Sequence, residues 1–206
     1  MSVGWFVLGA MSWSASEYAI HRFVGHGSKR PPVRSLLARL TPVGLATEFN
    51  REHLAHHTDP SYFAPTERKV LAAAVAVPLL TTALAPVLGV RRAASFGAGF
   101  ALAYGAYEVL HRRIHTHAPR GPCGRWLRRH HLLHHSKTPR KNHGVTTPVW
   151  DLVFGTFTPK ERVRVPQRTA PVWLAGEDGS VRAELRDDYE IVPQPRPTRG
   201  SDSLAR

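Results

Sequence analysis

The chain has 206 residues, enough for one domain with or without a tail, and carries 28 Lys and Arg against 15 Asp and Glu. Its single cysteine, Cys123, excludes an intrachain disulfide. Thirteen histidines beside two methionines are the strongest anomaly, since imidazole is the commonest metal ligand near neutral pH.

The basic charge is concentrated before residue 159. Residues 159–206 hold nine of the basic and eight of the acidic residues, which leaves 19 and seven for the rest of the chain. Such an excess suits either nucleic acid or an anionic membrane surface. The basic residues flank apolar segments and no nucleic-acid recognition motif accompanies them, so we expect a membrane and no nucleic-acid partner.

The first apolar segment is "VGWFVLGAMSWSASEYAI", residues 3–20, with Glu17 as its one acid. A cleaved signal peptide would also be apolar, but no basic stretch precedes this segment. Cleavage near Ala15 would leave His21 and His26 on a very short stub. The sequence therefore favours a retained membrane span.

Residues 70–90 form an uncharged run of 21 residues, and a bilayer core takes about 20 helical residues. After Arg91 and Arg92, residues 93–110 make a weaker candidate span, with small residues suited to close helix packing. The two segments are predicted to form a helical hairpin. Pro78 and Pro86 interrupt the first, which membrane helices tolerate better than soluble ones.

Three crossings would place residues 21–69 and 111–206, with every histidine, on one side of the membrane. Most Lys and Arg residues near span ends lie there too, which makes that side cytoplasmic. Arg91 and Arg92 count against this, so the hairpin is alternatively re-entrant. We expect an all-α integral membrane protein, multi-pass in the cell membrane, whose three transmembrane or re-entrant helices carry a cytosolic helical cap.

Residues 1–158 are predicted to be the membrane-embedded domain and residues 159–206 a polar tail. The stretch "PVWLAGEDGSVRAELRDDYEIV", residues 171–192, has the pattern of a short hairpin, and the last dozen residues are predicted to be disordered. No chemistry is assigned to the tail.

Ten histidines fall into four groups along the chain. Two groups share the pattern HxxHH, and residues at i, i+3 and i+4 lie on one face of a helix. His21 and His26 are five residues apart and do not share a face of a regular helix, so either Gly25 ends that helix or the two histidines bind different metals. The ten are His21 and His26; His53, His56 and His57; His111 and His115; His131, His134 and His135.

Ten imidazoles exceed the needs of one ion and suit two ions with four to six ligands each. An all-imidazole site favours Fe, Zn, Cu or Ni over Mg and Ca, which prefer oxygen. His117, His130 and His143 are set aside as surface or supporting residues, although His130 lies four residues from His134 and so competes with His131.

Three acids stand close to these histidines: Glu17, Glu52 and Glu108. A metal-bound histidine commonly donates its other N–H to a carboxylate or carbonyl, which orients the ring. The three acids, with His130 and His143, are therefore predicted to support the metal ligands through hydrogen bonds.

The segments "SEYAIHRFVGHG", "REHLAHHTDPSYFAPT", "AYEVLHRRIHTH" and "HLLHHSKTPRKNHGVTTPVWDLVFGTF" cover most of residues 16–157. Together they resemble the fatty acid hydroxylase superfamily, which also contains sterol desaturases and carotenoid hydroxylases. The order of the motifs and the segment "GVTTPVWDLVFGT" are most similar to the lipid 2-hydroxylase branch. Carotenoid hydroxylases usually have an aspartate where this chain has Arg112.

The resemblance implies an O2-dependent oxidoreductase that hydroxylates a C–H bond of a lipid or fatty acyl chain. It implies the ten histidines as ligands of two metal ions. Iron is expected because activation of O2 needs a metal that changes oxidation state, although zinc can occupy such a site in isolated protein. His143 stands where relatives often have an aromatic residue, and it is a candidate for an additional metal contact.

Relatives often carry a fused haem domain, for which this chain has no length, so a separate ferredoxin or cytochrome is expected to supply electrons. Many also have a further N-terminal span, whereas here the chain begins with the helix bearing "EYAIHR". Two alternatives stay open: sterol desaturation or carotenoid ring hydroxylation at the same metal site, and a non-catalytic, histidine-rich membrane protein that binds metal.

Overall fold

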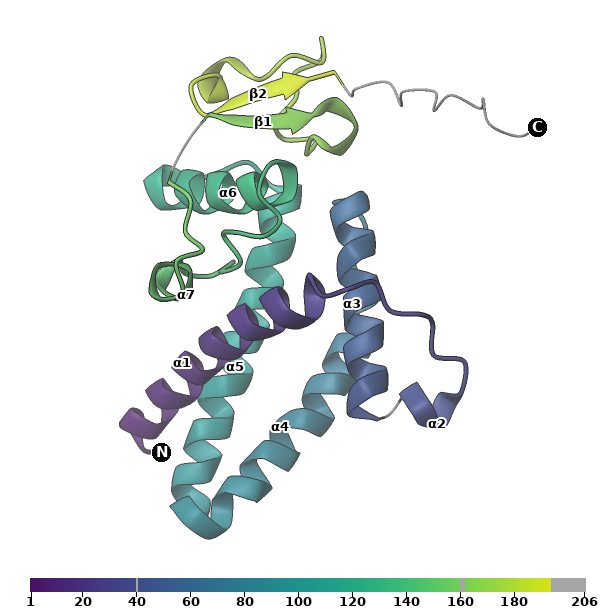
Figure 1. The fold of residues 1–206 in the computed structure, drawn as a ribbon. Coiled ribbons are helices and arrows are strands. Elements are labelled where there is room, and N and C mark those ends of the chain that lie inside the picture. The colour runs from purple at the N-terminus through teal and green to yellow at the C-terminus, as the bar shows by residue number, and fades with distance from the viewer. Residues whose placement is uncertain (40, 160–161, 194–206) are drawn as a thin grey trace, which may run out of the picture.

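The computed structural model describes residues 1–39, 41–159 and 162–193. A helical bundle forms one end of the molecule, and a small two-stranded sheet lies at the other (Figure 1). The helices are α1 (Val3–Ala19), α2 (Leu36–Arg39), α3 (Pro42–Thr58), α4 (Thr66–Leu88), α5 (Val90–Thr116), α6 (Gly121–Ser136) and α7 (Val149–Val153). The π-helix η1 (Ile20–Gly25) continues α1 without a break.

Helices α4 and α5 form the predicted hairpin, joined at Gly89, whose φ of 77° is favourable for glycine. Pro78 and Pro86 lie inside α4 without ending it. Within the described residues, α4 alone has the length and apolar composition to cross a membrane. That residues 3–20 and 93–110 also cross the membrane stays a prediction.

Helix α1 crosses α5 at very short range because both helices present glycine at the crossing. A Cβ on Gly9 would lie 2.0 Å from the carbonyl oxygen of Phe96, and a Cβ on Gly99 would lie 1.9 Å from that of Phe6. The predicted role of small residues in close packing is thus confirmed for α5.

The chain starts at the end of the bundle where α4 and α5 join. The backbone N–H of Ser2 donates to Ser95 Oγ at 2.9 Å, near the start of α5. His111 and His115 occupy the last turns of α5, at its opposite end, beside α6 (Figure 1). The N-terminus therefore shares one end of the bundle with Arg91 and Arg92 in the first turn of α5, and the histidines lie at the other end.

The predicted all-α class is wrong in the tail. Strands β1 (Val163–Pro166) and β2 (Tyr189–Val192) pair in parallel, with Val163 opposite Tyr189. Between them lie the short 3-10 helices η2 (Gln167–Thr169) and η3 (Ala183–Leu185). An antiparallel bridge between Ala175 and Val181 matches part of the predicted hairpin. The predicted disorder of the last dozen residues falls outside the described residues.

The described part of the tail packs on α6 around a hydrophobic core. Trp173 donates its indole N–H to the carbonyl of Ile114 at 3.1 Å, and Arg129 forms an ion pair with Asp188. The core comprises Leu132, Leu133, Val163, Val165, Trp173, Leu174, Val181, Leu185 and Tyr189. This segment is therefore a folded cap over α6, which we call the C-terminal cap (residues 162–193).

Gly99→Ala should destabilise the protein, because the added methyl group overlaps the backbone of α1. We expect a loss of about 1–3 kcal/mol, the usual cost of overpacking, measured as the free energy of unfolding in detergent. Gly105→Ala, on the same helix, is the matched control, since a Cβ on Gly105 would meet no atom within 4 Å. Equal stability of the two variants would contradict the close α1–α5 crossing.

Candidate metal centre

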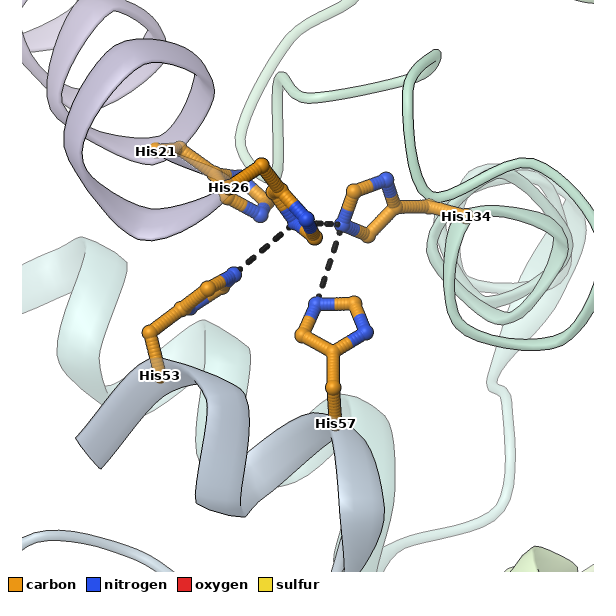
Figure 2. Close-up of side chains that lie close together, drawn as sticks. All are labelled: His21, His26, His53, His57 and His134. Carbon is orange, nitrogen blue, oxygen red and sulfur yellow. Dashed lines mark hydrogen bonds between the residues drawn. The ribbon is translucent and has the colours of Figure 1, made fainter. Parts of the chain in front are cut away.

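All ten predicted ligands come together in two groups of five, and in each group one nitrogen per residue lies within 4.8 Å of the others. Four segments supply them: the α1–η1 helix, α3, α5 and α6 (Figure 1). Group A, all of whose members are drawn in Figure 2, consists of His21, His26, His53, His57 and His134. Group B consists of His56, His111, His115, His131 and His135.

Each HxxHH motif is divided between the two groups. On α3, His53 and His57 join group A and His56 joins group B. On α6 the division is reversed, because His134 joins group A while its two motif partners join group B. The shared helix face was predicted correctly, but that face serves two adjacent sites.

The π-helix explains the spacing of five between His21 and His26. A π-helix bonds residue i to residue i+5, and the N–H of His26 donates to the carbonyl of His21 at 3.1 Å. Both rings therefore reach group A, and Gly25 is the last residue of this turn. A Cβ on Gly25 would lie 2.8 Å from the ring of His53, so glycine leaves room for that ring.

The rings of group A are arranged as around an octahedral ion. A ring whose nitrogen binds an ion at about 2.0–2.1 Å has its centroid about 3.2 Å from that ion. Two such centroids lie about 4.5 Å apart when the angle between them at the ion is 90°, and about 6.4 Å apart when they lie on opposite sides of the ion. The His21 and His57 centroids are 6.4 Å apart. His26 lies 4.6–5.2 Å from each of the other four rings. The position opposite His26 is left free by the five rings.

Group B repeats this arrangement around His115. His56 and His131 each lie 4.6–4.9 Å from both His111 and His135, which makes a square of four rings. His115 stands over the square, 4.6–5.3 Å from all four centroids. The position opposite His115 is left free.

Ring nitrogens in both groups approach one another as ligands of a common ion do. The Nε2 atoms of His26 and His53 are 2.9 Å apart, as are those of His115 and His131. Two nitrogens bound to one ion at about 90–110° are separated by roughly 2.9–3.4 Å. The residues thus fit two metal ions, and group B fits as well as group A.

Backbone carbonyls fix the orientation of three rings. The Nδ1–H groups of His21, His56 and His134 donate to the carbonyls of His143, Tyr62 and Lys141, at 2.5, 2.8 and 2.7 Å. Since a carbonyl only accepts, each ring must carry its proton on Nδ1 and present a free Nε2. That is the tautomer that metal binding through Nε2 requires.

Glu17 supports the site through the loop after His143, and within the described residues its hydrogen bonds do not go to a ring nitrogen. Its carboxylate accepts from the N–H groups of Val145 and Thr146, at 2.7 and 3.1 Å, and from the Thr146 hydroxyl. These bonds tie α1 to the loop that carries His143, whose carbonyl orients His21.

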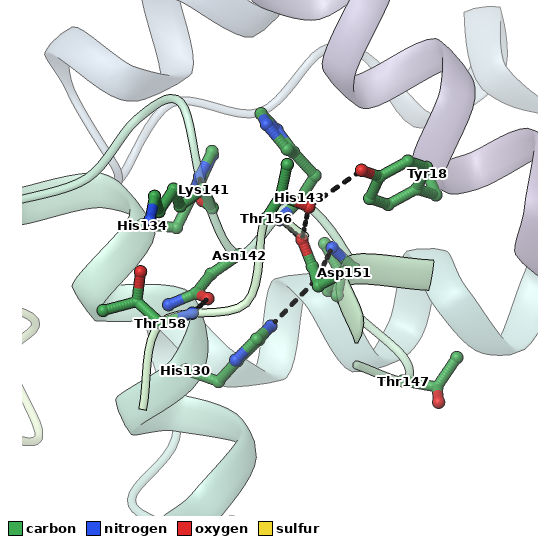
Figure 3. A network of polar contacts seen from close by, with 12 residues as sticks. Tyr18, His130, His134, Lys141, Asn142, His143, Thr147, Asp151, Thr156 and Thr158 are labelled. Atoms are coloured by element: carbon green, nitrogen blue, oxygen red, sulfur yellow. Dashed lines mark hydrogen bonds and ion pairs between the residues drawn. The ribbon is translucent and has the colours of Figure 1, made fainter. Parts of the chain in front are cut away.

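Asp151, on α7, was missed by the sequence analysis although it anchors the same loop (Figure 3). It accepts from the N–H groups of His143 and Gly144, both at 2.8 Å, and lies 3.4 Å from His130 Nε2. Burial alone would raise the pKa of Asp151, but the bonds from His130 and the loop hold it below its usual range. An ionised Asp151 thus fixes the loop, and His130 lies outside both groups.

The His143 ring lies beside group A rather than in it. Its centroid is 5.3–5.4 Å from those of His21, His26 and His134, so it lies at nearly equal distances from the three rings. A ring in the position opposite His26 would lie about 6.4 Å from His26, so His143 does not occupy that position. His117 is exposed and hydrogen-bonds to Thr116.

The other two acids act at some distance from the rings. Glu52 accepts from the hydroxyl of Tyr62, whose carbonyl orients His56. Glu108 pairs with Lys69 at 2.5 Å, which joins α5 to the start of α4. For three rings the acceptors are therefore carbonyls and not these acids, and two of the acids, Glu17 and Glu52, hold segments that supply such a carbonyl.

Burial keeps the ring nitrogens neutral and available. It lowers the pKa of His57 from 6.5 to about 2 and those of His26 and His56 to about 4, with further lowering by charge on neighbouring groups. The pKa of His134 is held well below 6.5 for the same reasons. Neutral imidazole is the form that binds metal.

The family model described as fatty acid hydroxylase matches residues 6–156. Dihydroceramide fatty acyl 2-hydroxylase FAH1 of Arabidopsis thaliana is 30% identical over 169 residues, covering 78% of this chain and 63% of that protein. Fatty acid 2-hydroxylase of Rattus norvegicus is 29% identical over 160 residues, covering 77% and 41%.

A solved structure described as full-length scs7p, with only the hydroxylase domain visible, superposes with a TM-score of 0.55 at 28% identity. It covers 75% of this chain and 55% of that one. The chain thus spans less than two thirds of the length of each of these proteins.

Gly25→Ala should weaken metal binding at group A alone, because its methyl group displaces the His53 ring. We expect one of two bound metal equivalents to be lost or bound at least about tenfold more weakly, measured by titration with atomic emission detection. Gly105→Ala, with open space around its Cβ, should retain both. Full binding by Gly25→Ala would show that this contact does not position His53.

The metal-free protein should lose stability as the pH falls below about 6.5. The unfolded chain takes up protons there, whereas the folded histidines, with pKa values of about 4 or less at His26, His56 and His57, do not. The loss for each such histidine approaches about 1.4 kcal/mol per pH unit well below pH 6.5, where the unfolded side chain is fully protonated. Denaturation between pH 7.5 and 5.5 measures the slope; a midpoint independent of pH would mean that the rings are solvated.

Proposed function

Since the chain belongs to the fatty acid hydroxylase family, in the branch of lipid 2-hydroxylases, we propose that it is a membrane-bound oxygenase. It uses O2, two metal ions and electrons from a separate donor to hydroxylate a C–H bond of a fatty acyl chain. The observation that carries the proposal is the pair of five-histidine groups, each with one nitrogen per residue within 4.8 Å of the others, which would hold two metal ions side by side.

Iron is the metal that this reaction requires. The ten imidazoles suit Fe, Zn, Cu or Ni, but zinc does not change oxidation state and so cannot activate O2. Two iron ions, when bound, supply the redox chemistry for breaking the O–O and C–H bonds. Zinc in isolated protein would report on affinity and not on function.

The chain's own residues bind the ions, keep the ligands neutral and exclude water. His21, His131 and His134 are at most 4% exposed. The carbonyls of Tyr62, Lys141 and His143 hold the rings on Nδ1, so that Nε2 stays directed at the ion. A dry, fixed environment of this kind protects reactive species from side reactions.

Carbon 2 of the acyl chain is the proposed position of attack. The relatives are named fatty acid 2-hydroxylase and dihydroceramide fatty acyl 2-hydroxylase. The match over residues 6–156 spans all ten histidines of groups A and B.

The proposed membrane arrangement places α1, α4 and α5 in the bilayer of the cell membrane and the metal centre on the cytoplasmic side. Ser2 bonded to Ser95 at one end of the bundle, and the histidines at the other, support it. Basic residues at the histidine end, such as Arg22 and Arg112, favour the cytoplasm for that end. A cytosolic ferredoxin or cytochrome could then reach the centre.

The test is anaerobic reconstitution of the purified protein with Fe(II), followed by O2, a reductant and a panel of lipids, with mass spectrometry of the products. We expect two iron ions per chain and an acyl product heavier by one oxygen, hydroxylated at carbon 2. His131→Ala should lower product formation at least about 100-fold, while His117→Ala, at an exposed histidine outside both groups, should not.

Other outcomes separate the alternatives. A double bond in place of a hydroxyl, or turnover only of sterols or carotenoids, would assign another reaction of the superfamily. Full iron loading without any oxygenated product would leave a metal-binding membrane protein and refute the hydroxylase.

A further inference from the structure

The last turn of α5 carries His115, the ring that stands over the square of group B. An α-helix leaves its last four carbonyls without a partner inside the helix, so other groups must donate to them. The C-terminal cap supplies one donor, because the indole N–H of Trp173 bonds to the carbonyl of Ile114 at 3.1 Å. That carbonyl belongs to the peptide group that leads into His115. The cap therefore holds the backbone at this ligand.

Arg128 of α6 completes the attachment. Its guanidinium donates to the carbonyls of Arg113 and His117 at 3.0 and 2.8 Å, and it lies 5.8 Å from the centre of the Trp173 ring. Both Arg128 and Trp173 are buried, at 6% and 5% exposed. Loss of a buried donor leaves its carbonyl unpaired, since no water can take the donor's place. The end of α5 is thus fixed by buried bonds from α6 and from the cap.

The ring of His115 lacks the carbonyl acceptor that orients three other histidines. Its Nε2 lies 3.1 and 2.9 Å from the Nε2 atoms of His56 and His131, and so faces the position of the ion. Its Nδ1 is buried and has no hydrogen-bond partner in the described part of the chain. The position of this ring therefore depends on the backbone of α5, which Trp173 holds in place.

The C-terminal cap acts on group B more than on group A. It shares a hydrophobic core with Leu132 and Leu133 of α6, between the histidines of that helix. Helix α6 and the last turn of α5 supply group A with His134 alone, whose ring is already oriented by a backbone carbonyl. The same two segments supply group B with three of its five ligands: His115, His131 and His135.

We propose that Trp173 is a positioning residue for group B. By holding the peptide group before His115, it sets the affinity of group B for its metal ion, with little effect on group A. Trp173 lies outside residues 6–156, which match the family model, so the contact comes from the part of the chain beyond that match. The inference rests on metal binding by the two groups and does not require the hydroxylation reaction.

The test is titration of the full chain in detergent with Co(II), which binds to imidazole sites and is followed by its absorption. One background, His26→Ala with His53→Ala, leaves group B to be titrated, and the other, His56→Ala with His111→Ala, leaves group A.

Trp173→Phe is placed in both backgrounds, because it keeps an aromatic ring in the core and removes the N–H donor. We expect it to weaken Co(II) binding about tenfold at group B and to leave the affinity of group A unchanged. The absorption spectrum of saturated group B should shift as well, because His115 moves relative to the ion. A loss of protein stability alone would leave that spectrum unchanged.

Tyr189→Phe is the matched control. Tyr189 packs edge-on against Trp173 in the same core, and its buried hydroxyl has no hydrogen-bond partner among the described residues. It should leave the Co(II) affinity and spectrum of both groups as in the parent. A second variant carries 3-benzothienylalanine at position 173, which keeps two fused rings and replaces the N–H by sulfur. It should bind Co(II) as Trp173→Phe does, whereas the parent's affinity would assign the effect to lost volume and overturn the proposal.

Unchanged Co(II) binding at group B in Trp173→Phe, or an equal loss at both groups, would also overturn the proposal. No turnover takes place in these titrations, so the two proposals fail separately. If group B depends on Trp173 but the iron-loaded parent forms no oxygenated product, the hydroxylase function falls and the positioning role stands. If the parent hydroxylates lipid and Trp173→Phe binds Co(II) at group B with the parent's affinity, only the positioning role falls.

Discussion

The structure depends on the convergence of ten imidazoles on two points inside the protein. Their nitrogens approach within about 3 Å of one another, as for His26 and His53 or His115 and His131. Burial removes the water that would otherwise solvate these lone pairs, and a buried polar group without a partner is costly. Metal ions bound by both groups would offset this cost, so metal binding would stabilise the packing of η1, α3, α5 and α6 against one another.

Spacing predicted which histidines converge but not how they are shared. HxxHH on a helix gives one face, and that inference holds on α3 and α6. The division of His56 and His57 between two ions depends on how four helices cross, which no local pattern contains. The π-turn that brings His21 and His26 together was also hidden, since a spacing of five reads as divergent on an α-helix.

Supporting contacts were harder to foresee than ligands. Sequence proximity pointed to Glu17, Glu52 and Glu108 as direct partners of the rings, whereas backbone carbonyls take that role for three of them. A carbonyl belongs to every residue and leaves no signal in composition. Asp151 and the C-terminal cap escaped for a related reason: their contacts, including the parallel pairing of β1 with β2, join residues distant in sequence.

Because each HxxHH motif supplies ligands to both groups, metal binding at one group would affect metal binding at the other. Helices α3 and α6 each supply ligands to both groups, so an ion in group A already orders His56 beside His57, and His131 and His135 beside His134. Binding of the first ion would thereby order some ligands of the second site and reduce the conformational entropy lost when the second ion binds. Loss of one ion would weaken binding of the other for the same reason. Metal binding at one group would therefore change the affinity of the other group, because the same two helices position ligands of both.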